Sequence, residues 1–230
     1  MLCGRSIIKF CRRVRNRLSS YCNLIRLHIY HVDYGAHCCI HGKIYINLFQ
    51  SARMKIGDHF YCSSGVCVNA LSTNKRGAFY ATDEAVIEIG NYVGMSSPVL
   101  WCHKRITIGN HVKLGAGCVL IDTDAHNMDY LSRREQCTDW GATAPIVIED
   151  DAFIGMNCII LKGVTIGSRS IIAAGSVVTR SIPADCIGVI CRKCNPLMGF
   201  RAGSQVTINM VRLWARAVAS TSVTCSPCFV

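Results

Sequence analysis

The chain has 230 residues, 50% of them apolar, and a formal net charge of +11. This length and apolar fraction exclude wholesale disorder and suffice for a buried core in one large or two small domains. No window reaches the roughly 18 uncharged apolar residues that a transmembrane helix needs. The first residues are basic and lack the compact apolar stretch of an export signal, so we expect a cytoplasmic protein.

The positive charge is concentrated at one end of the chain. Residues 1–30 hold seven of the 25 Lys and Arg residues and no acidic residue. Because the remainder is close to neutral, the sequence does not favour nucleic-acid binding, which needs a basic face on the folded body.

The same segment predicts an amphipathic basic helix within residues 1–35. Apolar residues recur there at helical spacing, namely Ile7, Cys11, Val14, Leu18 and Ile25. Two interpretations of this helix stay open. It caps the end of the domain that follows, or it attaches the protein peripherally to the anionic inner surface of a membrane.

The chain contains 16 cysteines. Many of them, including Cys62, Cys118 and Cys158, stand where small apolar residues would serve, so we expect reduced, buried thiols. The pairs Cys191–Cys194 and Cys225–Cys228 outline a four-cysteine zinc site. The gap between these pairs exceeds the usual spacing, and we therefore expect no metal.

A six-residue repeat decides the expected fold. From Ile148 the sequence divides into blocks of six that open on an aliphatic residue, namely Ile148, Ile154, Ile160, Ile166, Ile172 and Val178. A helix needs apolar spacings of three and four, and a strand alternates by two, so neither explains this period. A triangular coil does, because three six-residue sides complete one turn and the leading aliphatic residues stack inside.

The repeat extends upstream and sets the expected domain limits. The same register recurs at Ile89, Met95, Ile108, Leu114 and Leu120, and more weakly at Ile56, Cys62 and Val68. A small insertion or bulge is expected between Ile89 and Ile108, where the interval exceeds three hexads by one residue. We expect the coil to span residues 36–190, followed by a tail, 191–230, with a short helix at 205–219.

One interruption of the repeat carries candidate chemistry. No multiple of six fits between Leu120 and Ile148, which predicts an excursion loop over residues 125–144. The segment leading into it holds Asp122, Asp124, His126 and Asp129. An imidazole flanked by carboxylates is suited to general-base catalysis, although the pattern is also typical of a surface histidine beside solvated acids.

The stretches ITIGNHVKLGAGCVLIDTDAH and IVIEDDAFIGMNCIILKGVTIGSRSIIAAGSVVTRSIPADC resemble the hexapeptide-repeat acyltransferase superfamily. The nearest likeness is to the maltose/galactoside-type sugar O-acetyltransferases that modify capsule and lipopolysaccharide sugars. The resemblance implies an all-β, left-handed parallel β-helix assembled as a homotrimer, with acetyl-CoA as co-substrate between subunits. It also implies direct acetyl transfer to a sugar hydroxyl, without an acyl-enzyme.

Site residues follow from the same resemblance. His126 falls where the family has its catalytic general base, with Asp124 beside it. Ser96, Asp122 and Asp129 are the acceptor-binding candidates. The residues expected to line acetyl-CoA are Phe153, Gly155, Ala173, Thr179 and Arg180. The run after Gly188 departs from the family pattern and displaces Arg192 and Lys193, the cations expected to meet the nucleotide.

Two alternatives to this function remain. A catalytically silent member would be a binding or scaffolding solenoid. A metal-dependent enzyme of the γ-carbonic-anhydrase type would need three converging histidines, but His103, His111 and His126 lack the close pair that such a site requires.

Overall fold

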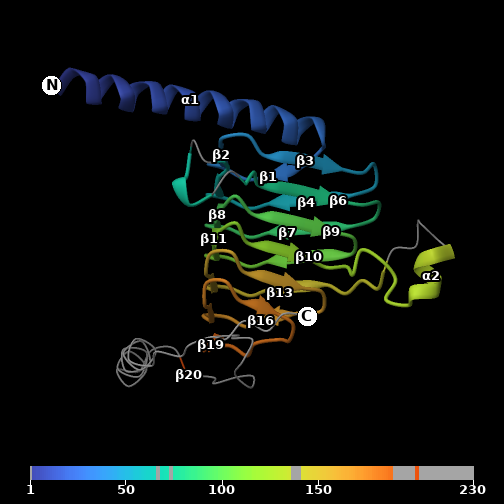
Figure 1. Ribbon diagram of the computed structural model, residues 1–230. Helices are drawn as coiled ribbons and strands as arrows, with labels where there is room; N and C mark the ends of the chain where they lie inside the picture. The colour runs from blue at the N-terminus through green and yellow to red at the C-terminus, as the bar shows by residue number, and fades with distance from the viewer. Residues whose placement is uncertain (1, 66–67, 73–74, 136–140, 189–199, 202–230) are drawn as a thin grey trace, which may run out of the picture.

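A computed structural model describes residues 2–65, 68–72, 75–135, 141–188 and 200–201. Short parallel strands stack into three sheets that form the sides of a triangular coil (Figure 1). Sheet A contains β1 (Asp33–Tyr34), β4 (Arg53–Ile56), β7 (Val86–Ile89), β10 (Arg105–Ile108), β13 (Ile146–Ile148) and β16 (Thr165–Ile166). Sheet B contains β2 (Cys39–His41), β5 (Tyr61–Ser63), β8 (Gly94–Ser96), β11 (Lys113–Ala116), β14 (Phe153–Ile154), β17 (Ile171–Ile172), β19 (Cys186–Gly188) and the antiparallel β20 (Phe200–Arg201). Sheet C contains β3 (Tyr45–Leu48), β6 (Ala78–Ala81), β9 (Val99–Cys102), β12 (Val119–Ile121), β15 (Ile159–Leu161) and β18 (Val177–Val178).

The core consists of the aliphatic residues that open the six-residue blocks. All six predicted residues from Ile148 to Val178 are buried, with at most 1% of their surface exposed. Each lies beside its counterpart on the next coil, as Leu114 does beside Ile154 and Leu120 beside Ile160. Cys62, Cys118 and Cys158 are free and fully buried in this core, as predicted. The predicted repeat and its inward-facing register are therefore confirmed.

In the irregular interval between Ile89 and Ile108, one side of the coil is shorter than six residues and the next is longer. Met95 pairs with Leu114 and Leu100 with Leu120, although Leu100 follows Met95 by five residues and Leu120 follows Leu114 by six. The next corner is correspondingly longer. The expected insertion is therefore the long corner between Leu100 and Ile108. A separate register shift between β8 and β11, at Leu114 to Ala116, lies outside this interval.

A second departure from the coil was not predicted. Between β5 and β6 the chain leaves sheet B and forms a short 3-10 helix, η1 (Ala70–Ser72). The expectation that Val68 is a coil position is wrong, because the fully buried Phe79 of β6 fills the core on this side. Buried hydroxyls hold the departure, since Ser97 Oγ donates to Ser72 Oγ at 2.8 Å.

The basic helix predicted at the start of the chain is present as α1 (Leu2–Ile29). Its C-terminal half lies across the end of the coil at β2, and its N-terminal half extends beyond the coil (Figure 1). No helix in the described ranges combines the length and apolarity needed to cross a bilayer. The predicted helix at 205–219 and both CxxC pairs fall outside the described residues.

Candidate functional site

The predicted excursion leaves the coil after β12 and returns at β13, at the corner between sheets C and A. A short antiparallel pairing closes its base, with a bridge between Thr123 and Thr143. Asp124 donates its backbone N–H to Ala142, and Ala144 donates to Asp122. Gly141 is required here, because a Cβ at this position would collide with the carbonyl oxygen of His126. The base of the excursion is thus fixed by backbone contacts.

His126 stands immediately beyond this base and is exposed to solvent. The preceding Ala125 adopts a φ of 63°, a left-handed conformation uncommon for a residue with a Cβ. Its N–H is held by Thr123 Oγ1 at 3.0 Å. After His126, the guanidinium of Arg133 donates to the carbonyl oxygens of Asn127 and Met128, each at 2.7 Å. The histidine is therefore held between two anchored segments.

Asp124 is oriented by a cation that the sequence analysis did not select. Its Oδ2 lies 3.2 Å from Nζ of Lys162, which follows β15 on the adjacent coil. The side chains are 25% and 30% exposed, so the pair is only partly solvated. Among the described residues, the imidazole of His126 makes no hydrogen bond or ion pair, either with Asp124 or with another side chain. Lys162 has an unremarkable position in the hexads, so its role could only be seen in three dimensions.

The prediction that Asp122 binds the acceptor is wrong. Its side chain is fully buried, and its carboxylate accepts the backbone N–H groups of His103, Lys104 and Arg105 at 2.7, 2.7 and 2.9 Å. A fully buried carboxylate that accepts three backbone N–H groups has no surface to offer a substrate. Asp122 therefore fixes the corner that follows β9, directly beside the base of the excursion.

Asp129 also has a local partner, at the start of α2 (Tyr130–Glu135). Its Oδ2 accepts the backbone N–H and the hydroxyl of Ser132 at 2.8 and 2.9 Å, which is the geometry of a helix N-cap. These hydrogen bonds lower the pKa of Asp129 below its ordinary value. The residue is exposed, and its contribution to acceptor binding stays a prediction.

An aromatic row on sheet C was missed by the sequence analysis. Tyr80 and Trp101 stack with ring centroids 4.1 Å apart, and Trp101 Nε1 donates to Nε2 of His103 at 2.9 Å. This bond requires an unprotonated Nε2. Burial lowers the pKa of His103, and the nearby Asp122 partly opposes the shift. The row ends at the corner from which the excursion emerges, because Asp122 binds His103. Counting six-residue blocks does not align these aromatic residues, because the intervals between their coils are irregular.

The remaining predicted residues divide between two edges of the coil. Ser96 is the last residue of β8, and Gly155 and Ala173 follow β14 and β17, so all three lie at or near the corner of sheets B and C. Phe153 lies on the exposed face of sheet B. Thr179 and Arg180 are exposed at the corner of sheets C and A, the same edge as His126. Ser96 is half-buried, and its Oγ contacts Ser63 Oγ and Asn69 Nδ2 at 3.0 Å.

Gly155 has a structural reason to be small, since a Cβ would lie 2.5 Å from the backbone nitrogen of Ala174. Its smallness alone does not indicate a ligand. Arg192 and Lys193 fall outside the described residues.

The three histidines weighed for a metal site are not gathered in this chain. His111 lies at the corner of sheets A and B, where its ring stacks on Tyr92 at 4.8 Å, whereas His103 and His126 belong to the opposite edge. In the described residues, no group of three His, Cys, Asp or Glu side chains could hold a metal ion.

Comparison with known proteins supports the repeat. Residues 145–180 match the family described as the hexapeptide repeat of succinyl-transferase. A Schizosaccharomyces pombe protein named for acetyltransferase activity is 45% identical over 84 residues, which is 36% of this chain and 39% of that protein. A 2,3,4,5-tetrahydropyridine-2,6-dicarboxylate N-acetyltransferase of Staphylococcus aureus is 36% identical over 81 residues, 35% of this chain and 28% of that enzyme. The matches thus span well under half the length of both relatives.

The fold has a solved counterpart. A mutant of AntD, an N-acyltransferase of Bacillus cereus in complex with dTDP-4-amino-4,6-dideoxyglucose and coenzyme A, superimposes with a TM-score of 0.55 at 14% identity. The superposition covers 84% of this chain and 96% of AntD. With the repeat, it establishes the predicted left-handed parallel β-helix. The chain is therefore a left-handed β-helix with hexapeptide repeats, and part of its sequence is similar to acetyltransferases.

Proposed function

We propose that this protein transfers an acetyl group from acetyl-CoA to a hydroxyl of a sugar or glycan precursor, with His126 as the general base. The observation that carries the proposal is the position of His126, an exposed imidazole on an excursion anchored on both sides. The repeat family, the acetyltransferase relative and the coenzyme A-bound AntD structure support the acyl-transfer class.

In the proposed reaction, the imidazole of His126 accepts one proton from the acceptor hydroxyl. Acetyl-CoA supplies a thioester carbonyl carbon. The acceptor oxygen bonds to that carbon while a ring nitrogen of His126 takes the hydroxyl proton, and His126 then returns the proton to the departing thiolate sulfur. A positioned general base contributes about 10²–10⁴-fold to such a step. Backbone N–H groups at the coil corners are the available donors for the developing oxyanion.

The division of the candidate residues between two edges supports a shared site in a homotrimer. His126, Thr179 and Arg180 belong to the edge between sheets C and A, whereas Ser96 and Ala173 belong to the edge between sheets B and C. One chain places these sets at different corners of its triangular section. Packing three copies around an axis parallel to the coil brings unlike edges together, so a cleft between neighbours can contain both sets.

The aromatic row gives the acceptor a surface. The stacked rings of Tyr80 and Trp101 and the ring of His103 line the face that ends beside the excursion. Aromatic rings pack well against the C–H faces of sugars, while the polar edges of the row provide hydrogen bonds. This arrangement favours a sugar over a small aliphatic acceptor.

The direct test is release of free CoA thiol from acetyl-CoA in the presence of neutral sugars, amino sugars and nucleotide sugars. We expect turnover with at least one sugar, and loss of about 10²-fold or more in His126→Ala. His111→Ala is the matched control, because His111 is also an exposed corner histidine but lies on another edge. Full turnover by His126→Ala would exclude this base, and transfer confined to amines would exclude the hydroxyl acceptor.

A silent scaffold is the second candidate, favoured by one observation. Asp124 is bonded to Lys162 and does not orient the imidazole of His126 within one chain. A scaffold predicts no thiol release with any acceptor and no binding of acetyl-CoA in calorimetry, whereas an enzyme tested with the wrong acceptor still binds acetyl-CoA.

A further inference from the structure

The apolar residues of α1 form one continuous stripe that faces solvent. We define the outer stripe as Ile7, Phe10, Val14, Leu18, Tyr21, Ile25 and Ile29. Their spacing of three and four places them on one side of the helix. All are exposed, including Phe10 at 67% and Leu18 at 62%. An apolar surface of this length is uncommon on a protein that remains fully in water.

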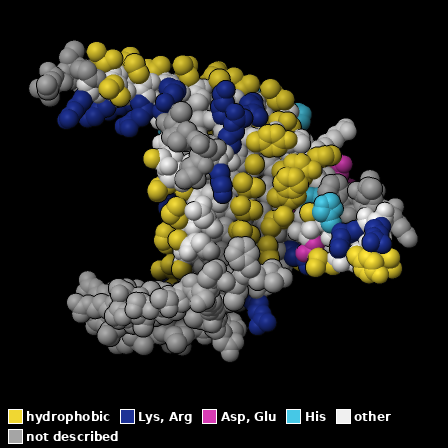
Figure 2. All heavy atoms as spheres, viewed as in Figure 1, with side chains coloured by type: hydrophobic (Ala, Val, Ile, Leu, Met, Phe, Trp, Pro, Cys, Tyr) yellow, Lys and Arg dark blue, Asp and Glu magenta, His cyan; other side chains and the backbone are white. Residues whose placement is uncertain are grey.

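The stripe points away from the coil, because the coil is bound by the opposite face. Asn23 donates to the carbonyl oxygens of Ile40 and Gly42, at 3.0 and 2.7 Å. Ser20 Oγ accepts the Ile40 N–H at 3.1 Å, and Leu27 is fully buried. The helix therefore caps the coil through a mostly polar face. Figure 2 shows apolar side chains along the outer side of α1 and basic ones beneath them.

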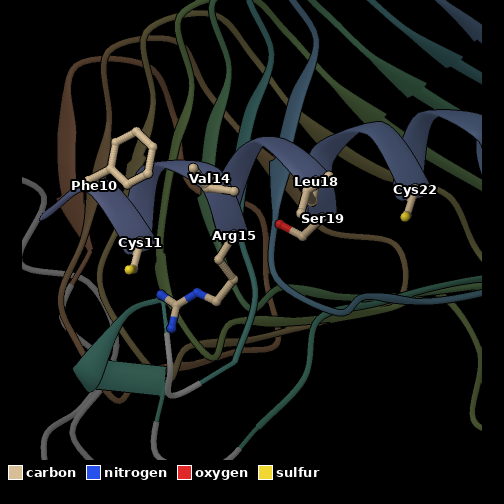
Figure 3. Close-up of a pocket in the computed structure, with 7 residues that line it drawn as sticks. All are labelled: Phe10, Cys11, Val14, Arg15, Leu18, Ser19 and Cys22. Carbon is tan, nitrogen blue, oxygen red and sulfur yellow. The ribbon is translucent and has the colours of Figure 1, made fainter. Parts of the chain in front are cut away.

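The hollow along α1 is open surface and has no enclosing wall. It is lined entirely by residues of the helix itself, namely Phe10, Cys11, Val14, Arg15, Leu18, Ser19 and Cys22 (Figure 3). A cavity for a small molecule needs walls from more than one element. The surface is suited to a broad partner that lies along the helix.

The charges on α1 indicate which kind of partner binds the outer stripe. Arginines and one lysine accompany the stripe on both flanks, and no acidic residue occurs between Leu2 and Ile29. A second copy of α1 packed on the stripe would bring arginines against arginines, which destabilises a helical pair. An anionic surface instead attracts the cations that flank the stripe, at about 1 kcal/mol each near a charged bilayer. Arg26 is not among them, because its guanidinium donates to the carbonyl oxygen of Ile44 at 2.7 Å.

We propose that α1 lies in the interface of a membrane rich in anionic lipid, with the outer stripe among the acyl chains and the arginines at the phosphates. A helix of this length covers about 40 Å of membrane surface. Because α1 crosses the end of the coil (Figure 1), the membrane meets that end and leaves the sides, with the His126 excursion, in water. The proposal does not depend on the acetyl-transfer function.

The experiment is sedimentation of the full chain with vesicles of phosphatidylcholine alone and of phosphatidylcholine mixed with phosphatidylglycerol. We expect binding to the anionic vesicles, weakened by high salt. The double variant Phe10→Ser, Leu18→Ser should lose about tenfold or more in affinity. Arg13→Gln with Arg17→Gln should lose roughly 30-fold, the equivalent of two surface cations.

The matched controls make the same kinds of substitution at exposed positions outside α1. Tyr130→Ser with Leu131→Ser removes two exposed apolar residues from α2, and Arg53→Gln with Lys55→Gln removes two exposed cations from β4. Both controls should bind vesicles like the unaltered chain. Circular dichroism and size-exclusion chromatography establish that every variant is folded.

Native thiols give a second readout. Cys11 and Cys22 are exposed beside the stripe, so anionic vesicles should slow their reaction with a water-soluble maleimide, measured peptide by peptide. Unchanged labelling together with absent or control-like sedimentation would overturn the proposal. So would a change of oligomeric state in the stripe variant without lipid, because the stripe would then be a protein interface.

Discussion

The ammonium of Lys162 lies 3.2 Å from the carboxylate of Asp124, across the base of the excursion that carries His126. The contact joins two successive coils, since Asp124 follows β12 and Lys162 follows β15. It is the one ion pair among the described residues that ties the excursion to the body of the coil.

Lys162→Met should reduce turnover more than stability. A partly exposed ion pair contributes at most about 1 kcal/mol, so the melting temperature should change little. If His126 is the base, as proposed, a small displacement of its imidazole costs much more in rate, and we expect kcat to fall about 10- to 100-fold. Steady-state kinetics and calorimetry measure the two effects. Lys162→Arg should restore most of the rate, and a variant with unchanged kcat would remove Lys162 from the site.

Asp122→Asn should destabilise the fold. The buried carboxylate accepts three backbone N–H groups, and an amide presents one oxygen and two competing donors to them. We expect a loss of about 2–4 kcal/mol in the free energy of unfolding, measured in urea. Asp129→Asn should cost much less, because Asp129 is an exposed helix cap and asparagine caps a helix about as well as aspartate. Equal effects would contradict the structural role of Asp122.

Gly141→Ala should disturb the excursion while leaving the coil folded. The added methyl meets the carbonyl oxygen of His126 and Cβ of Asp124, so the base of the loop must move. We expect a large loss of turnover, with the unfolding transition of the coil retained. Gly94→Ala is the control, because its methyl meets only the flexible side chain of Lys113, at 3.1 Å. Normal turnover in Gly141→Ala would show that this close approach is not needed.

His103 should titrate below its ordinary value near 6.5. Burial lowers its pKa, so the unfolded chain binds the proton more readily than the folded one. Its contribution to stability is therefore complete above about pH 6.5 and declines as the pH falls toward the folded pKa. Nuclear magnetic resonance should show the Trp101 indole N–H shifting with the same midpoint, because protonation of Nε2 breaks their bond. A midpoint at or above 6.5 would refute this environment.

Mixed oligomers test the shared site. His126→Ala removes the proposed base from one edge, and Ala173→Trp fills the proposed cofactor-binding edge of the same chain. Each variant alone should be inactive. Co-expressed chains should regain activity at the interfaces that combine an intact base with an intact edge, whereas a site within one chain predicts no recovery.

The sequence alone determined the coil, because a six-residue period with aliphatic openings has one regular solution that buries them. It also located the excursion, where the period fails between Leu120 and Ile148, and the amphipathic character of α1. These features are local or periodic, and each can be counted along the chain.

Only the tertiary structure decided which polar groups are occupied and which are free. Asp122 and Asp124 are two residues apart, yet one is buried against three backbone N–H groups and the other faces Lys162. The direction of the outer stripe also depends on contacts with a distant strand, since Asn23 and Leu27 bind the coil through the opposite face. Hydrogen-bond satisfaction and burial depend on neighbours from other coils, and no spacing along the chain encodes them.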